Sequence, residues 1–111
     1  MKGFRALLIG IACTLSAPVM AGSEMEACEN TLSVAQKNGI INGMSAKSDG
    51  IHVVVDSAVW KQSPYTTKMG IASVVECAIA GPGKRLSGVI FRDSRTNKVV
   101  GRYRYPNLDV E

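Results

Sequence analysis

Four arginine residues near the end of the chain have the type and spacing of an anion-binding surface. Arg92, Arg102 and Arg104 lie in two runs of alternating polar and apolar residues, and Arg95 lies in the turn that would join those runs. Because side chains on a β-strand alternate between its two faces, the first three arginines are expected to share one face. A guanidinium group binds a carboxylate or a phosphate through paired hydrogen bonds. The four residues therefore predict a binding surface for an acidic partner.

The basic charge is concentrated around these arginines. The segment 84–104 has seven Lys or Arg residues and one acid, Asp93, whereas the whole chain has a net charge of only +4. Proteins that bind nucleic acids usually have a larger basic excess, so a nucleic-acid partner is not expected. An alternative interpretation of the same pattern is a solvated sheet face whose charges prevent pairing between sheet edges.

Other reactive residues are isolated. His52 is the only histidine, and no group of Cys or His residues has the spacing of a metal site. The glycine-rich segment 81–85 follows a predicted helix, whereas a phosphate-binding loop precedes one. No metal, cofactor or catalytic set is therefore predicted. His52 is expected to be exposed or half-buried on a strand. Trp60 is expected to fill the edge of the core, and a binding anchor is the alternative role for it.

The first 21 residues have the three parts of a secretory signal peptide. Lys2 and Arg5 form a positive start, residues 6–15 are almost wholly apolar, and cleavage is expected after Ala21. The apolar run is too short to cross a bilayer, which takes about 20 residues. The expected product is a periplasmic or secreted protein without a membrane span. It would consist of one small α+β domain, residues 22–111.

The cysteines predict one disulfide bond. Cys13 lies in the signal segment and would be removed with it; in an alternative interpretation it is the lipidated cysteine of a lipoprotein signal. Cys28 and Cys77 remain. An even number of cysteines in an oxidising compartment favours a disulfide between them. The alternative is a pair of reduced, buried thiols that act as small apolar residues.

Two helices are predicted. The first covers 23–37, where apolar residues recur at spacings of three and four, and Ser23 and Glu26 have the spacing of a capping box. The second covers 63–80, with Ser63 as its N-cap and the following proline in the first helical position. The second half of this helix is apolar on nearly all sides, which predicts a place between the sheet and the first helix.

Two hairpins complete the predicted fold. A short strand over 40–47 is expected to pair with a strand over 51–56, which is rich in β-branched residues. A clearer hairpin joins 86–93 to 98–105, with Asn97 in the left-handed conformation of its turn. The element order is α-β-β-α-β-β. It predicts a two-layer α+β fold in which an antiparallel or mixed sheet of three to four strands carries both helices on one face.

These features predict a non-catalytic binding or accessory module of the cell envelope. Its partner would be an acidic protein, a lipid head group or an acidic glycan, held by the basic hairpin face. Two alternatives come from other classes of protein. One is an inhibitor or immunity-type protein that blocks a secreted enzyme or a transfer machine. The other is a small envelope hydrolase that would use His52 or Asp56.

Overall fold

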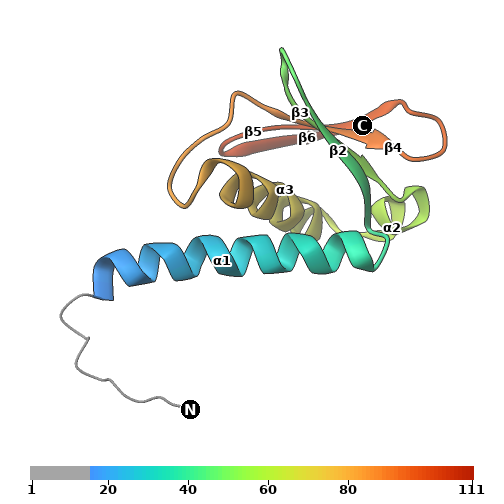
Figure 1. The fold of residues 1–111 in the computed structure, drawn as a ribbon. Helices are drawn as coiled ribbons and strands as arrows, with labels where there is room; N and C mark the ends of the chain where they lie inside the picture. Colours follow the sequence, from blue (N-terminus) through green and yellow to red (C-terminus); the bar gives the residue numbers. More distant parts are fainter. Residues whose placement is uncertain (1–15) are drawn as a thin grey trace.

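The computed structural model describes residues 16–111, which form three helices and one five-stranded sheet (Figure 1). The fold is α+β, as predicted, with all the helices on one side of the sheet. In chain order the elements are α1 (Ser16–Lys37), β2 (Ile41–Lys47), β3 (Gly50–Val55), α2 (Ser57–Gln62), α3 (Tyr65–Ala80), β4 (Val89–Asp93), β5 (Val99–Arg104) and β6 (Asn107–Val110).

The sheet is mixed, and its strands lie in the order β2-β3-β4-β5-β6. Only β3 and β4 are parallel, and α2 and α3 form the crossover that connects them. The other neighbours are antiparallel. The prediction of three to four strands missed β6, a short edge strand that follows Pro106. Its alternation of exposed and buried residues places Leu108 in the core.

The helix boundaries differ from the predicted ones. Because α1 begins at Ser16, Ser23 lies inside the helix and is not an N-cap. The unpredicted helix α2 begins after Asp56, whose carboxylate accepts the backbone N–H of Val59 at 3.0 Å. Ser63 follows the end of α2, where its hydroxyl donates to the carbonyl of Val59 at 2.6 Å. The N-cap position of α3 is Pro64, which offers no side-chain hydrogen bond.

The hydrophobic core lies between the sheet and α3. Val53 and Phe91 are fully buried on β3 and β4, and Val75 of α3 belongs to the same cluster. Trp60 of α2 is buried there as well, as expected for a residue that fills the core edge. Its ring stacks on that of Phe91, with 4.8 Å between the ring centroids. The side chain of Trp60 is therefore not available as a binding anchor.

The disulfide prediction is confirmed. Cys28 of α1 and Cys77 of α3 are bonded to each other, with their Cα atoms 5.9 Å apart. In Figure 1, α3 lies between α1 and the sheet, as the apolar second half of the helix predicts. The disulfide therefore fixes the outer helix to the helix that covers the sheet.

A buried carboxylate holds the segment between α3 and β4. Glu76 on α3 accepts the backbone N–H of Leu86 at 2.9 Å and the hydroxyl of Tyr103 at 3.3 Å. Arg85 lies 3.4 Å from the same carboxylate. Glu76 therefore holds this segment at the point where it enters the sheet, which explains an acid within an otherwise apolar helix.

The predicted signal sequence lies mostly outside the described residues. The expected cleavage point after Ala21 falls within the span of α1. Among residues 16–111, no helix combines the length and the hydropathy needed to cross a membrane.

Candidate functional site

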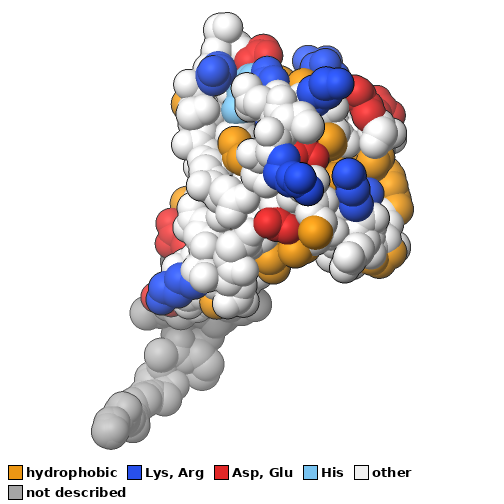
Figure 2. Space-filling model, turned by 90° about the vertical axis from the view of Figure 1, so that its right-hand side faces the viewer, with side chains coloured by type: hydrophobic (Ala, Val, Ile, Leu, Met, Phe, Trp, Pro, Cys, Tyr) orange, Lys and Arg blue, Asp and Glu red, His pale blue; other side chains and the backbone are white. Residues whose placement is uncertain are grey.

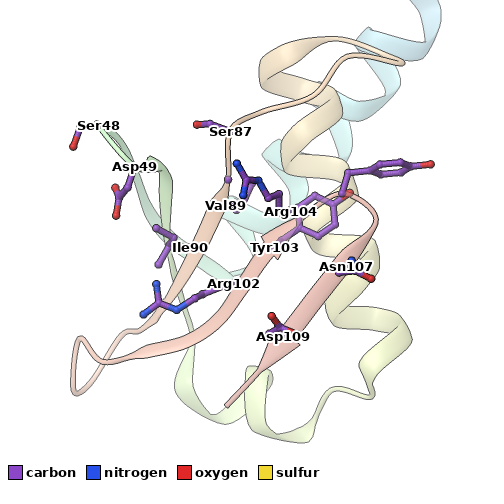
Figure 3. A pocket seen from close by; sticks show the side chains of 12 residues that line it. Ser48, Asp49, Ser87, Val89, Ile90, Arg102, Tyr103, Arg104, Asn107 and Asp109 are labelled. Carbon is purple, nitrogen blue, oxygen red and sulfur yellow. The ribbon is translucent and has the colours of Figure 1, made fainter.

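A hollow of about 620 Å³ lies across β4, β5 and β6, with the β2–β3 turn at its rim (Figure 3). Its volume is within the range of small-ligand sites. Ile90, Arg102 and Arg104 belong to the sheet face that carries no helix, because their neighbours in sequence, Val89, Phe91 and Tyr103, face the core. The residues that line the hollow are Ser48, Asp49, Ser87, Gly88, Val89, Ile90, Arg102, Tyr103, Arg104, Tyr105, Asn107 and Asp109.

Arg102 and Arg104 project from β5 into this hollow, two of the four arginines that the sequence singles out. Both are exposed. Arg102 makes a loose ion pair with Glu111, with 3.7 Å between the guanidinium Nε and the carboxylate. No ion pair or side-chain hydrogen bond of Arg104 is found within residues 16–111.

The guanidinium of Arg92 is hydrogen-bonded to other groups of the protein. Its Nε donates to Nδ1 of His52 at 3.0 Å, and its Nη1 donates to the backbone carbonyl of Asn97 at 2.9 Å. Arg92 does not line the hollow. Asn97 has a φ of 62°, so the left-handed turn residue is where the sequence predicts it. Arg92 thus joins β3 to the turn that follows β4.

His52 is buried, with 4% of its surface exposed, whereas the sequence predicted an exposed or half-buried position. Its Nε2 lies 2.7 Å from a carboxylate oxygen of Asp49. Because Arg92 can only donate, Nδ1 must accept, and the ring proton is on Nε2, which donates to Asp49. This hydrogen bond is the main reason that the pKa of Asp49 lies below its usual value. Both ring nitrogens of His52 therefore have hydrogen-bond partners within the protein.

Arg95 lies in the β4–β5 turn, away from the hollow. Its backbone N–H, not its guanidinium, makes the local contact, a 2.7 Å bond to the carboxylate of Asp93. Asp93 also accepts the N–H of Thr96 and the hydroxyl of Ser57. These donors, with the N–H of Arg95 first among them, lower the pKa of Asp93. The structure therefore brings only two of the four arginines to one site.

Tyr105 lies at the end of β5 and lines the hollow with 53% of its surface exposed. The strand predicted over 98–105 included Tyr105, but β5 ends one residue earlier, at Arg104. The guanidinium of Arg85 lies over the Tyr105 ring, 3.4 Å from the ring centroid. Arg85 is therefore shared between Tyr105 and the buried Glu76.

The hollow is not a uniformly basic surface. Its charged lining consists of two arginines, Arg102 and Arg104, and two aspartates, Asp49 and Asp109, so these charges balance. On the face drawn in Figure 2, basic and acidic side chains are likewise interspersed. In the hollow and on this face, the local excess of basic residues in the sequence therefore does not form a continuous positive patch.

Sequence reasoning missed Asp49, Asn107 and Asp109. Asp49 lies in a turn, where an acidic residue has an ordinary local role. Asn107 and Asp109 lie on the unpredicted strand β6. The polar–apolar alternation after Pro106 is the one signal that could have revealed that strand.

The comparisons with known proteins give this site no precedent. Neither protein-family models, curated proteins nor solved structures contain a match to the chain. Across residues 16–111, no group of three or more His, Cys, Asp or Glu side chains has an arrangement that could hold a metal ion. The site must be interpreted from its own chemistry.

Proposed function

We propose that this chain is a non-catalytic binding module of the cell envelope, periplasmic or secreted, which binds an acidic partner in the hollow on its helix-free sheet face. The observation that carries the proposal is the pair Arg102 and Arg104 on the wall of one hollow. Arg104 in particular has a guanidinium with no protein partner among the described residues. Such a group is suited to bind a carboxylate or phosphate through two hydrogen bonds.

The disulfide supports the proposed compartment. A bond between Cys28 and Cys77 persists where thiols are oxidised, outside the cytoplasm. The signal-peptide pattern of the first 21 residues supports the same location. Export with cleavage after Ala21 remains part of the proposal.

The arrangement of His52 supports a binding role over hydrolysis. A histidine beside an aspartate resembles part of a catalytic triad, but here the second ring nitrogen accepts from Arg92, where a nucleophile would have to lie. Asp56 is occupied as the cap of α2. The two residues that could serve a hydrolase therefore have local structural partners.

An in-cell crosslinking experiment tests the proposal. The tagged protein and its R102E/R104E variant are crosslinked in the envelope and purified, and K98E, which reverses one charge outside the hollow, serves as the control. We expect the native protein and K98E to capture the same partner and the double variant to lose it. Circular dichroism checks that the double variant is folded. Equal capture by all three proteins would disprove the proposal, and capture of a secreted enzyme that loses activity would favour the inhibitor alternative.

A further inference from the structure

We propose that the ligand of the hollow is a saccharide that carries a carboxylate, with Arg104 binding the carboxylate and the polar residues of β6 binding neutral hydroxyl or amide groups. The inference rests on the proposed function and narrows its acidic partner to one chemical class. Three features support it. They are the balance of charges in the hollow, the hydrogen-bond donors and acceptors that face each other across β5 and β6, and the small residues on the floor of the hollow.

The charge balance argues against a polyanion. Asp49 and Asp109 line the same hollow as the two arginines, and Glu111 lies beside Arg102. A polyphosphate, a sulfated chain or a nucleic acid would bring several negative charges against these carboxylates, and like charges in one site repel. One ligand carboxylate can instead be placed at Arg104, whose guanidinium has no hydrogen-bond or ion-pair partner among residues 16–111. The hollow is therefore suited to a ligand with few negative charges.

The strand register supplies the remaining polar groups. Arg104 is directly opposite Asn107 on β6, and Arg102 is opposite Asp109. The carboxylate of Asp109 can only accept hydrogen bonds, so its ligand partner must donate, whereas Asn107 can both donate and accept. The hydroxyl and acetamido groups of a sugar offer donors and acceptors at short intervals. Phosphodiester and sulfate groups offer no donors at neutral pH.

The floor of the hollow argues against a lipid tail. Ile90 has only 6% of its surface exposed, and the adjacent Gly88 and Ser87 have small side chains or none. The floor therefore offers one mostly covered apolar side chain and two small residues, and charged side chains lie around it. A flat ring with polar edges can lie on such a surface, whereas an acyl chain would leave the surrounding charged groups without partners.

The test uses four probes and nuclear magnetic resonance titration of the protein with its disulfide intact. The disaccharide of N-acetylglucosamine and N-acetylmuramic acid carries one lactyl carboxylate, and di-N-acetylchitobiose has the same type of backbone without it. Digalacturonate carries its carboxylates directly on the sugar rings and has no lactyl substituent. Comparing it with the muramic disaccharide distinguishes these two kinds of carboxylated sugar. A heparin oligosaccharide is the polyanion. We expect at least one carboxylated sugar to shift the resonances of Gly88, Arg104 and Asn107, with chitobiose and heparin binding at least about tenfold more weakly.

Variants assign the contacts. R104Q should weaken binding of the carboxylated sugar about tenfold or more, because it removes a charge-assisted hydrogen-bonding group. K98Q removes one positive charge outside the hollow and should leave binding unchanged. D109N should not strengthen binding of the sugar, since it replaces one of the two oxygens that could accept from a ligand hydroxyl with an NH2 donor.

Three results would overturn the inference: chitobiose binding as tightly as the tighter-binding carboxylated sugar, tighter binding of heparin that D109N strengthens further, or no response to either carboxylated sugar. These outcomes separate the two proposals. If no sugar binds but envelope crosslinking still requires Arg102 and Arg104, the binding module stands and its acidic partner is not a carboxylated saccharide. If crosslinking is also insensitive to these arginines, both proposals fail.

Discussion

The guanidinium of Arg92 donates its Nε–H to Nδ1 of His52 across the only parallel strand pair of the sheet, at 3.0 Å. The same side chain reaches the carbonyl of Asn97 in the β4–β5 turn, and His52 continues the chain of hydrogen bonds to Asp49. Three segments far apart in the sequence are thus connected on the helix-free face. In this arrangement Arg92 is a structural residue, and it supports the strands that carry the hollow.

Replacing Arg92 with Gln should therefore destabilise the protein more than it affects ligand binding. The change removes charge-assisted bonds to His52 and to Asn97, which should lower the free energy of unfolding by about 1–2 kcal/mol. Urea denaturation followed by circular dichroism measures this difference. R95Q is the matched control, because the guanidinium of Arg95 has no hydrogen bond within the described chain, and its effect should stay within about 0.5 kcal/mol. Equal stability of R92Q and the native protein would contradict this role.

The sequence predicted the parts of the fold that depend on local pattern. The β-branched run at β3, the apolar second half of α3 and the left-handed Asn97 each have a physical signature within a few residues. The disulfide was predictable as well, because only Cys28 and Cys77 remain once the signal segment is set aside. Such features need no knowledge of how distant strands pair.

The candidate site was only partly predictable, because pairing across the sheet determines it. The alternation of Arg92, Arg102 and Arg104 correctly placed them on one face, but their partners come from other strands. His52 precedes Arg92 by 40 residues, and only the β3–β4 pairing brings them together. The acids that balance Arg102 lie on β6 and after it. A count of basic residues in one segment therefore overestimated the positive charge of the surface.

The disulfide should make a large contribution to the stability of so small a domain. It closes a loop with a sequence separation of 49 residues, for which chain entropy predicts a contribution of about 4 kcal/mol. The C28A/C77A variant should lose stability of this order in urea denaturation. Thiol labelling of the unfolded, unreduced protein, once the signal segment is cleaved, should find no free cysteine. A labelled thiol at either position would contradict the assignment.

Asp93 should make stability depend on acid pH. The N–H groups of Arg95 and Thr96 and the hydroxyl of Ser57 hold the pKa of Asp93 below its usual value of 3.8 in the folded state. The folded state therefore binds this proton less readily than the unfolded state. The resulting stabilisation is complete above the unfolded pKa and is lost as the pH falls through the folded one.

D93N removes this carboxylate, so its unfolding free energy should fall less steeply at acid pH than that of the native protein. Urea denaturation at a series of pH values measures both curves. D109N, which also removes one carboxylate but none of the hydrogen bonds found in residues 16–111, is the matched control. If the unfolding free energies of D93N and the native protein changed in parallel with pH, the turn would not lower the pKa of Asp93.

The pKa of Tyr103 tests whether the buried carboxylate of Glu76 interacts with the Tyr103 hydroxyl. Burial, and next the nearby charge of Glu76, raise the pKa of Tyr103 above 10.0. Because its folded pKa is raised, Tyr103 stabilises the fold below the unfolded pKa, and this contribution is lost as the pH rises. E76Q should lower the pKa of Tyr103, which alkaline titration of tyrosinate absorbance can follow. Y65F/Y105F isolates the Tyr103 signal, and an unchanged titration in E76Q within that background would rule out the interaction.

Gly50 should be the glycine least tolerant of substitution beside the hollow. Its φ of 132° is a conformation that side chains rarely adopt, and a Cβ at this position would overlap the backbone carbonyl of Gly88. That carbonyl accepts the N–H of Ile51 at 3.0 Å, so it cannot move without breaking the first bond between β3 and the segment before β4. G50A should therefore lower the unfolding free energy by at least about 2 kcal/mol.

Gly43 offers the matched control for this change. It also lies in a strand of the same hairpin, but a Cβ there would meet no atom within 4 Å, and its φ is not positive. G43A should be neutral, or stabilising by up to about 1 kcal/mol, because alanine has less conformational entropy to lose on folding. Gly88 lines the hollow, so G50A should also weaken ligand binding, whereas G43A should not. Equal stability of the two variants would mean that β3 and the segment before β4 do not approach each other as closely as the structure shows.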